Sequence, residues 1–478
     1  MDDSNHLFKD RLDKIKQWLI DSPYPNNFSR TTEAAEIPSL YQLGNVEKSY
    51  SLAGRLKAKR VMGKSSFFVL EDYSGTIQLY LSHAVLENYD SCVHFDVGDI
   101  VGVQGTIFVT KTGEVSLKIT FCQLLSKCLI PLPEKYHGLK DEELRVRKRY
   151  LDLIMSSERR NLFKTRSSIV TEVRDYLHSL GFLEVETPMM HPIAGGASAK
   201  PFVTFHNELE QEMFLRVAPE LYLKRLIVGG FEKVFELNRN FRNEGVSTRH
   251  NPEFTMVEMY QAYADFNVMM DLCESLFAHV IKKCTTQSLG QTPLFPCRRV
   301  TMEETVETAC PTLIGKTRDT QALLSYCLTQ AIPVESHWGS GKLLCEIFEK
   351  KVEHTLQAPT FVTHYPLEVS PLARTNDDDQ EVTDRFEFFI GGREIANGFS
   401  ELNNPIDQEN RFKLQQRLKE TGDSEAMPFD QDYITALQYA MPPTAGMGIG
   451  IDRLVMVLTN SPSIRDVILF PLVRQDQS

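Results

Sequence analysis

The chain has 478 residues, a length that suits two or three domains and is too long for one ordinary domain. Hydrophobic residues make up 42% and charged residues 24%, which is the composition of a globular protein and excludes a disordered one. The 52 basic and 64 acidic residues give a net charge of −12, so any binding of nucleic acid needs a local basic surface. No stretch approaches the roughly 18 apolar residues of a membrane span, and no signal peptide is visible, so we expect no membrane segment.

The nine cysteines are scattered along the chain and include no Cys-x-x-Cys pair. This spacing is typical of reduced thiols in the cytosol and not of a disulfide framework. The 12 histidines are dispersed as well, so neither residue type predicts a zinc site. We therefore expect a cytoplasmic protein.

Two zones are predicted at the start of the chain. Residues 1–50 hold an amphipathic helix, expected from Leu7 to Ile20, and then a loop. Residues 51–128 have the pattern of a β domain, because polar and apolar residues alternate over 76–81 and two strand-like runs flank a Lys-Thr-Gly turn at 111–113. Short strands over so short a zone predict a small barrel, either a plain β domain or one that binds nucleic acid.

The remainder of the chain is predicted to be one larger domain. Residues 129–150 contain prolines typical of a linker or hinge, and residues 151–474 mix strands and helices without a βαβ rhythm. Within the larger domain, residues 285–365 are predicted to be a mostly helical insertion. The basic residues from Arg145 to Arg166 are either a solvated helix face or a contact with phosphates.

A strand-like segment that ends at Arg242 has one polar and one mostly apolar face. A charged loop follows, and then a second strand-like segment begins at Phe254. Two strands joined in this way would place Arg242, Phe254, Glu258 and Tyr260 on one surface. An aromatic ring beside an arginine suits an adenine and a phosphate, whereas the alternative is a solvent-exposed sheet face.

A second polar region is a hairpin whose predicted turn is Gly391-Gly392. With a two-residue turn, Glu387 would pair with Ala396, and Glu387 and Glu394 would share one face. Two carboxylates so placed suit Mg²⁺ bound alongside substrate phosphates.

The same hairpin strand continues to three further side chains that share a face: Asn397, Phe399 and Glu401. On a flat strand this set would lie opposite Glu394. A β-bulge near residues 396–398 would bring both sets to one face, and Gly398 is the predicted place for it.

The third region is the glycine-rich stretch 442–453, which leads into an apolar helix. Spaced glycines allow a strand backbone to approach a ligand closely. Arg453 is predicted at the start of the helix, where its charge and the helix N-terminus both favour phosphate.

Together these regions resemble class II aminoacyl-tRNA synthetases, and within that class the lysyl-tRNA synthetases, over nearly the whole chain. The three motifs of the class are similar to three strings of this sequence, at residues 182–188, 241–254 and 446–453. Specificity for lysine over the aspartyl and asparaginyl relatives rests on three further strings, at residues 218–222, 254–260 and 397–401.

The resemblance implies an α+β fold with two main parts. Residues 51–128 would form an N-terminal OB-fold β-barrel that binds the anticodon. Residues 151–474 would form the class II catalytic domain, an antiparallel β-sheet flanked by helices. The implied reaction is the ATP-dependent ligation of L-lysine to tRNA(Lys) through a lysyl-adenylate, with Mg²⁺ as cofactor and ATP as co-substrate. The resemblance also implies a homodimer.

The resemblance assigns a role to each matching residue. ATP would be held by five side chains, of which the two catalytic arginines are the first and last: Arg242, Glu244, His250, Phe254 and Arg453. Lysine would be held by seven residues: Gly196, Glu220, Glu258, Tyr260, Asn397, Phe399 and Glu401. Mg²⁺ would be held by Glu387 and Glu394. The anticodon would be read by Arg60, Phe67 and Gln78, with Phe67 stacking on a base.

One residue departs from the family pattern. The usual string Glu-Ile-Gly-Asn-Gly-Phe-Ser-Glu has alanine at position 396 here, which would add a methyl group beside the pocket. The related ligases that modify elongation factor P share this alanine, so a protein-modifying ligase is the second hypothesis. That family lacks the β-barrel domain, which this chain has. A catalytically inactive paralogue is the third hypothesis, and the presence of the catalytic residues disfavours it.

Overall fold

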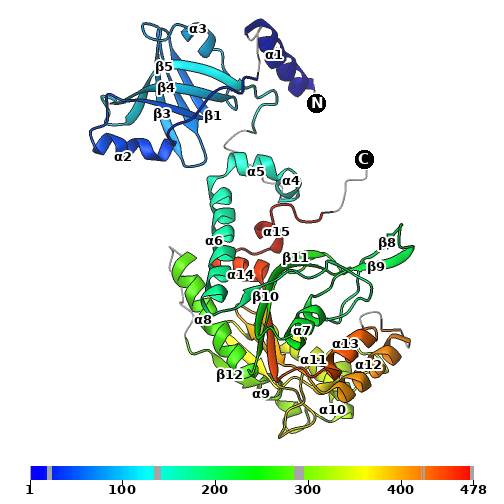
Figure 1. The fold of residues 1–478 in the computed structure, drawn as a ribbon. Helices are drawn as coiled ribbons and strands as arrows, with labels where there is room; N and C mark the ends of the chain where they lie inside the picture. Colours follow the sequence, from blue (N-terminus) through cyan, green and yellow to red (C-terminus); the bar gives the residue numbers. More distant parts are fainter. Residues whose placement is uncertain are drawn as a thin grey trace. The chain divides into compact units, whose positions relative to one another are not determined.

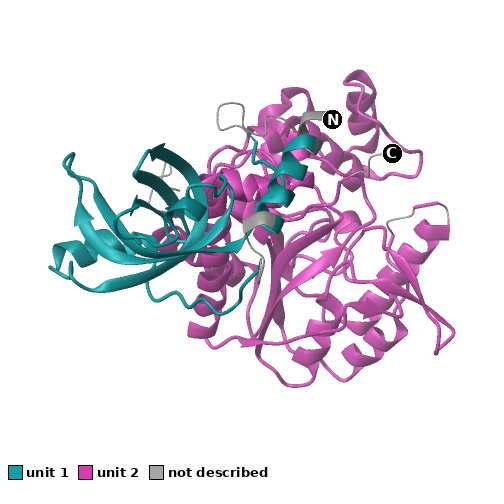
Figure 2. Ribbon diagram, turned by 90° about the horizontal axis from the view of Figure 1, so that it is seen from above, with its two compact units in different colours: residues 1–140 teal, residues 141–478 magenta. Residues whose placement is uncertain are grey.

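The computed structural model describes residues 2–18, 24–133, 142–284, 295–420, 422–423 and 426–473. The chain divides into two compact units, Met1–Lys140 and Asp141–Ser478 (Figure 2). The boundary between them falls within the predicted linker. In the described part of the chain, no helix is both long and apolar enough to cross a bilayer.

The N-terminal unit is a closed five-stranded barrel with the strand order β1-β2-β3-β5-β4 (Figure 1). Its elements are α1 (Asp2–Trp18), η1 (Ala34–Glu36), α2 (Ile37–Gln42), β1 (Ser49–Met62), β2 (Ser65–Glu71), β3 (Thr76–Ser82), α3 (Tyr89–Cys92), β4 (Ile100–Val109) and β5 (Val115–Ser126). The alternation predicted for β3 is confirmed, since Ile77, Leu79 and Leu81 enter the barrel core. The β4–β5 turn is also present, with Gly113 at φ +89°.

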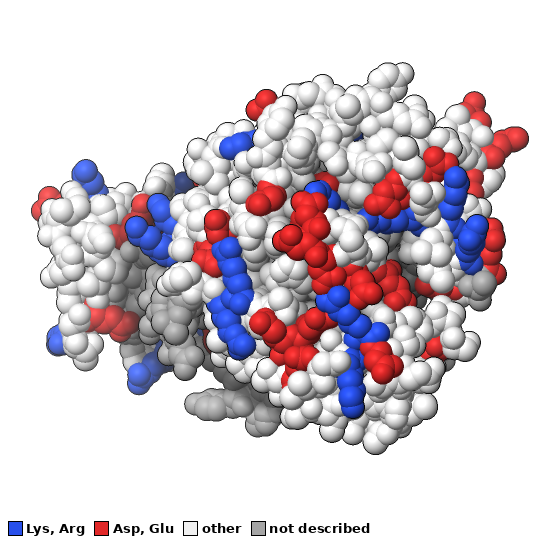
Figure 3. Space-filling model, turned by 90° about the horizontal axis from the view of Figure 1, so that it is seen from below, with Lys and Arg blue, Asp and Glu red and all other residues white. Residues whose placement is uncertain are grey.

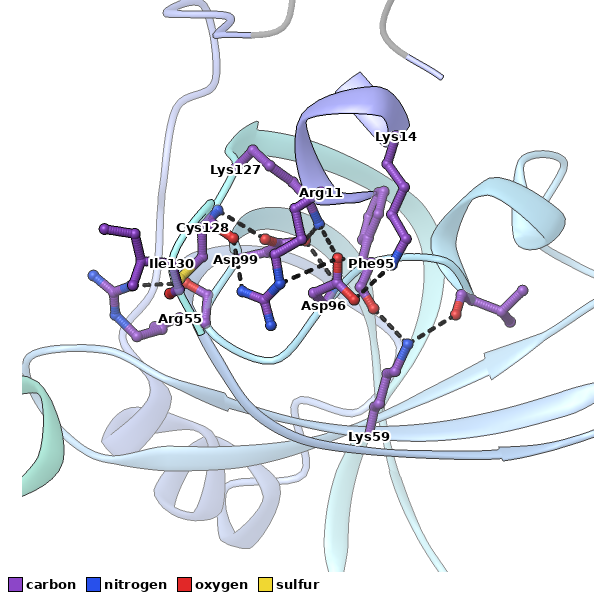
Figure 4. Close-up of polar contacts among 12 residues, drawn as sticks. Arg11, Lys14, Arg55, Lys59, Phe95, Asp96, Asp99, Lys127, Cys128 and Ile130 are labelled. Carbon is purple, nitrogen blue, oxygen red and sulfur yellow. Dashed lines mark hydrogen bonds and ion pairs between the residues drawn. The ribbon is translucent and has the colours of Figure 1, made fainter. Parts of the chain in front are cut away.

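The first helix begins earlier than predicted, at Asp2, and Ile20 lies outside the described residues. The helix is held against the barrel by a partly buried ion-pair cluster (Figure 4): Lys14 donates to Asp96 at 2.8 Å, and Lys127, which follows β5, donates to Asp99 at 2.8 Å and also to Asp96. Burial alone would raise the pKa of Asp96, but Lys127 and Lys14 lower it below its usual value.

The C-terminal unit contains an eight-stranded sheet with the order β12-β13-β14-β15-β16-β11-β10-β6. The pairings from β13 to β10 are antiparallel, and β12 and β6 pair in parallel at the two edges. The sheet strands are β6 (Leu183–Glu184), β10 (Lys233–Phe241), β11 (Glu253–Ala262), β12 (Arg298–Thr301), β13 (Thr360–Thr363), β14 (Arg385–Phe389), β15 (Glu394–Ser400) and β16 (Thr444–Gly450).

One face of this sheet forms the main hydrophobic core with α6, α8 and α14. The helices of the unit are α4 (Glu142–Arg147), α5 (Arg149–Met155), α6 (Ser157–Ser179), α7 (Glu220–Val228), α8 (Phe266–Cys284), α9 (Met302–Ala309), α10 (Thr320–Thr329), α11 (Ser340–Lys351), α12 (Pro405–Glu420), α13 (Gln431–Gln438), α14 (Ile451–Leu458) and α15 (Ile464–Val467), with short 3₁₀ turns η2 (Pro311–Leu313), η3 (Glu353–Thr355) and η4 (Leu367–Val369). A separate small sheet has the order β7-β9-β8, from β7 (Met190–His191), β8 (Val203–His206) and β9 (Gln211–Leu215).

The segment predicted as a helical insertion contains α9, α10 and α11, which share a core of their own. It also contains β12 and β13, which extend the main sheet. Residues 285–294 lie outside the described part of the chain.

Three arginines of the basic run have a structural role that neither sequence interpretation included. Arg149 is 1% exposed and donates to the backbone carbonyls of Leu469 and Arg465. Arg159 pairs with Asp466 at 3.1 Å, and Arg166 pairs with a buried aspartate of α14. These arginines therefore fasten the C-terminal segment to α5 and α6.

Charge is mixed on the molecular surface. Figure 3 shows lysine and arginine side chains interspersed with acidic ones on the face that it draws. The net charge of −12 therefore does not make that face uniformly acidic.

Candidate active site

A cavity of ≈ 1180 Å³ opens on the sheet face opposite the main core. All the ATP, lysine and Mg²⁺ residues assigned from the sequence lie in its wall: Gly196, Glu220, Arg242, Glu244, His250, Phe254, Glu258, Tyr260, Glu387, Glu394, Asn397, Phe399, Glu401 and Arg453. Strands far apart in sequence thus bring these residues to one concave surface.

Strands β10 and β11 build the first part of the wall. Their register places Glu236 opposite Glu258 and Asn240 opposite Phe254, as two strands joined by a loop require. The guanidinium carbon of Arg242 lies 5.1 Å from the centre of the Phe254 ring. Nε of Arg242 is buried and has no hydrogen-bond partner among the described residues, so this arginine has bonding capacity left for a ligand.

The hairpin β14–β15 has a bulge, but at a different place from the predicted one. Phe389 pairs with Glu394 and Phe388 with Ala396, so the extra residue is Ile395 and not Gly398. Glu387 consequently lies opposite Asn397 and not opposite Ala396. The bulge occurs here because two consecutive apolar residues, 395 and 396, both enter the core.

The two carboxylates proposed for Mg²⁺ each contact an arginine. Arg385 donates to Glu387 at 2.6 Å, and Arg453 donates to Glu394 at 2.9 Å. Burial and the nearby Glu394 carboxylate raise the pKa of Glu387 to about 7. A divalent cation would reduce this repulsion between the two carboxylates. Carboxylate oxygens are also ligands that suit Mg²⁺.

Arg453 lies in the first turn of α14, where the sequence placed it. Its Nη2 lies 3.2 Å from Nε2 of His250, and burial together with this arginine lowers the pKa of His250. Arg453 therefore contacts both the Glu394 carboxylate and the His250 ring, and it disfavours the protonated form of His250.

The glycines of β16 make room for neighbouring side chains as well as for a ligand. A methyl group on Gly446 would collide with the Glu401 carboxylate and the Tyr260 ring. On Gly448 it would meet the Met256 side chain at 2.7 Å. Glycine is thus required here so that the acidic end of the cavity can form.

Three buried carboxylates gather at that end: Glu220, Glu258 and Glu401, all less than 10% exposed. Burial and Glu220 raise the pKa of Glu258 to about 8. Burial also raises the pKa of Glu401 well above its usual value, and Lys224 opposes that shift. Oε1 of Glu401 has no hydrogen-bond partner in the described part of the chain. Such an excess of buried acid calls for a cationic ligand.

In the N-terminal unit, the three proposed anticodon residues lie on adjacent strands. Arg60 pairs with Phe67 across β1 and β2, while Gln78 on β3 donates to Glu114 at 2.8 Å. The Phe67 ring is 5.2 Å from the ring of Tyr80, which in turn is 5.6 Å from that of Phe108. The barrel therefore presents a row of aromatic rings on which bases can stack.

Sequence reasoning missed several of these residues. Tyr80 on β3 and Phe108 on β4 continue the Phe67 row, although β5 lies between their strands in the barrel. Arg385 donates to Asn397 at 3.0 Å as well as to Glu387. Lys224 contacts both Glu220 and Glu401, and the four-residue interval from Glu220 was its only signal.

The alanine that departs from the family pattern does not lie where the sequence suggested. Ala396 is 1% exposed and belongs to the hydrophobic core beneath the sheet, and the cavity wall does not include it. The prediction that the Ala396 methyl group lies beside the pocket is therefore wrong, because the bulge at Ile395 directs Ala396 into the core.

Comparison with known proteins identifies relatives of both units. Residues 141–474 match the family model of class II tRNA synthetases (D, K and N), and residues 50–125 match the model of the OB-fold nucleic acid binding domain. A lysine--tRNA ligase of Thioalkalivibrio sulfidiphilus is 50% identical, with 98% of this chain and 96% of the relative aligned. Lysine--tRNA ligases of Legionella pneumophila (strain Paris) and Aromatoleum aromaticum are each 51% identical, covering 98% and 99% of this chain and 97% and 98% of theirs.

Proposed function

Because the chain belongs to the lysine--tRNA ligase family of class II tRNA synthetases, we propose that it ligates L-lysine to tRNA(Lys) with ATP. The observation that carries this proposal is the acidic end of the cavity, where Glu220, Glu258 and Glu401 are buried together. A substrate with two ammonium groups compensates this charge, whereas an aspartate side chain would add to it.

We propose that lysine and ATP lie end to end in the cavity. Glu401 and Tyr260 hold the ε-ammonium group, with Glu258 beside them, and Phe399 packs on the methylene groups. Glu220 and the backbone of Gly196 receive the α-ammonium group, and Asn397 contacts the carboxylate. All of these residues belong to the wall of the cavity that also contains Arg242.

At the other end, Phe254 stacks on the adenine and Arg453 covers the opposite face of the base, with Glu244 and His250 also contacting ATP. The lysine carboxylate attacks the α-phosphorus in line and pyrophosphate leaves. Arg242 neutralises the charge that spreads onto the phosphate oxygens in the transition state. The terminal 3′-hydroxyl of tRNA then attacks the lysyl carbonyl, and AMP is released.

The function is tested by lysine-dependent exchange of pyrophosphate into ATP, followed by transfer of lysine to tRNA(Lys) or to elongation factor P. Exchange with lysine and charging of tRNA alone are expected. Transfer to elongation factor P would support the protein-modifying ligase instead. The alternative was based on Ala396 as a pocket residue, but Ala396 lies in the core. The barrel, which the protein-modifying ligases lack, is present.

We propose that Glu387 and Glu394 would hold Mg²⁺, whose positive charge would offset the negative charge of the ATP phosphates. Since the pKa of Glu387 is raised to about 7, this carboxyl is increasingly protonated below that pH and then binds Mg²⁺ less well. The half-saturating Mg²⁺ concentration for pyrophosphate exchange at saturating ATP should be about tenfold higher at pH 6 than at pH 8. The Glu387→Gln variant should lose this dependence, and an equal Mg²⁺ requirement of the wild type at both pH values would contradict the assignment.

The barrel is proposed to read the anticodon through Arg60, Phe67 and Gln78. Because stacking on an aromatic ring contributes about 1–3 kcal/mol per base, Phe67→Ala should raise KM for tRNA(Lys) about tenfold or more in aminoacylation. Pyrophosphate exchange, which needs no tRNA, should keep its rate. Phe121→Ala is the matched control, since Phe121 is an exposed ring of β5 that stacks on Phe28 and not on the Phe67 row. Equal effects of the two substitutions would count against the anticodon role of Phe67.

We propose that the protein is a homodimer. Around the small sheet, apolar side chains are exposed in a number unusual for a free surface: Met189, Met190, Ile193, Val203, Phe205 and Leu209. This surface follows the string at residues 182–188, which is similar to the motif that packs at the dimer interface in the class. Light scattering should give twice the chain mass of 54.6 kDa. The nine free thiols support a cytoplasmic location.

A further inference from the structure

Lys224 is a fully buried cation that links two parts of the proposed lysine pocket. Its Nζ donates to Oε1 of Glu220 at 2.6 Å and forms an ion pair with Oε2 of Glu401. The same Nζ lies 5.3 Å from the centre of the Phe399 ring. Its side chain is 0% exposed. One ammonium group thus joins a carboxylate on α7 to a carboxylate that directly follows β15.

Lys224 is placed behind the pocket and not in it. Glu220, Phe399 and Glu401 are in the cavity wall, whereas Lys224 is not. A ligand in the cavity would therefore contact both carboxylates while the lysine remained on their far side. Because burial of an ammonium group is strongly unfavourable unless the group is well paired, a lysine at this position needs both acidic partners.

Lys224 and the acidic groups around it shift one another's pKa values. The titratable or charged groups that face the cluster come from four elements (α7, β11, β14 and α13) and from the end of β15: Glu220, Glu258, Tyr260, Arg385, Glu401 and Tyr433. Burial raises the pKa of both Glu220 and Glu401, and in each case Lys224 opposes the rise. Burial alone would lower the pKa of Lys224, but the two glutamates raise it, so it stays charged.

We propose that Lys224 is a positioning residue for the amino-acid substrate: as the shared counter-ion of Glu220 and Glu401, it offsets the charge of both carboxylates and holds them at a fixed separation, so that each can receive one ammonium group of lysine. This inference rests on the proposed function of the cavity and adds a selectivity element to it. Without Lys224, the two buried carboxylates would have lost their common cation, and the pKa of each would rise further, which favours the protonated form. A protonated carboxyl cannot form an ion pair with a substrate ammonium group.

The test uses Lys224→Met and Lys224→Gln in the full chain, with pyrophosphate exchange measured from pH 6 to pH 9. KM for lysine should rise at least tenfold at pH 7 and then fall as the pH increases, because each deprotonation restores a carboxylate. The pH above which KM for lysine becomes constant should move upward by one unit or more relative to the wild type. KM for ATP should stay within twofold. Glutamine removes the charge but keeps two N–H donors on a polar side chain one atom shorter, so this variant decides the question if methionine prevents folding.

Lys127→Met is the matched control, because Lys127 is also a buried lysine between two carboxylates, Asp96 and Asp99, in the N-terminal unit. It should leave KM for lysine and its pH profile unchanged. A wild-type pH profile in the Lys224 variants, or a lower kcat and melting temperature without a shift in that profile, would overturn the proposal. A wild-type protein without lysine-dependent exchange would instead refute the proposed function, so the two failures are distinguishable.

Discussion

Replacing Glu401 by glutamine should reduce kcat/KM for lysine-dependent pyrophosphate exchange by about a hundredfold or more. The carboxylate is buried, and removing one partner of a buried charge pair costs about 3–5 kcal/mol. Oε1 of Glu401 has no partner among the described residues, so the proposed ε-ammonium group would be its main compensation on that side. The loss should appear mainly in KM for lysine, while the Kd for ATP, measured by equilibrium binding, stays nearly constant.

The control for Glu401→Gln is Glu409→Gln. Glu409 lies on α12 and pairs with Lys413 at the surface, so it tests the same chemical change outside the cavity. Exchange rates of this variant should equal those of the wild type. If Glu401→Gln kept a wild-type KM for lysine, Glu401 would have no role in binding the ε-ammonium group.

Replacing Arg242 by alanine should reduce the rate of lysyl-adenylate formation by about a thousandfold. Preorganised donors aimed at charge that develops in a transition state contribute about 10²–10³ in rate, and an arginine on a transferring phosphate can contribute more. Arg242 is suited to this because its Nε has no partner in the described part of the chain and its guanidinium lies over Phe254. Single-turnover formation of the adenylate measures this step directly.

Arg239→Ala provides the comparison on the same strand. The Arg239 side chain is 59% exposed and pairs with Glu253, so its loss removes a surface arginine of β10 without touching the cavity. Adenylate formation should be unchanged in this variant. Near-normal adenylate formation by Arg242→Ala would show that another group neutralises the phosphate.

The sequence was sufficient to predict the two units and the surface that β10 and β11 form. In that hairpin the side chains alternate without interruption, so the faces follow from counting, and Arg242, Phe254, Glu258 and Tyr260 all line the cavity. In β15, the predicted pairing with β14 was wrong by one residue beyond the bulge. Glycine can accommodate a bulge, but the bulge occurs at Ile395 because the core accepts two consecutive apolar side chains there.

Lys224 and the arginines of α5 and α6 were harder to predict for a different reason. A glutamate and a lysine four residues apart are typical of an exposed helix face, yet α7 is buried on several sides and both residues lie inside. Arg149 and Arg166 contact the C-terminal segment about 300 residues later in the chain. Local periodicity holds no information about such distant partners.

With its bulge at Ile395, β15 sets the distance between two parts of the proposed substrate site. A strand advances about 3.3 Å per residue, so the seven steps from Glu394 to Glu401 span roughly 20 Å, with the proposed metal ligand at one end and the proposed ε-ammonium ligand at the other. The strand fixes how far apart the two ends of the bound substrates must lie. A deletion of one residue between these ends would shorten the strand. It would also move the side chains on one side of the deletion to the opposite face of the sheet, because side chains alternate with a period of two. A change in the length of β15 therefore disturbs both ends of the site, whereas a substitution along it changes one contact.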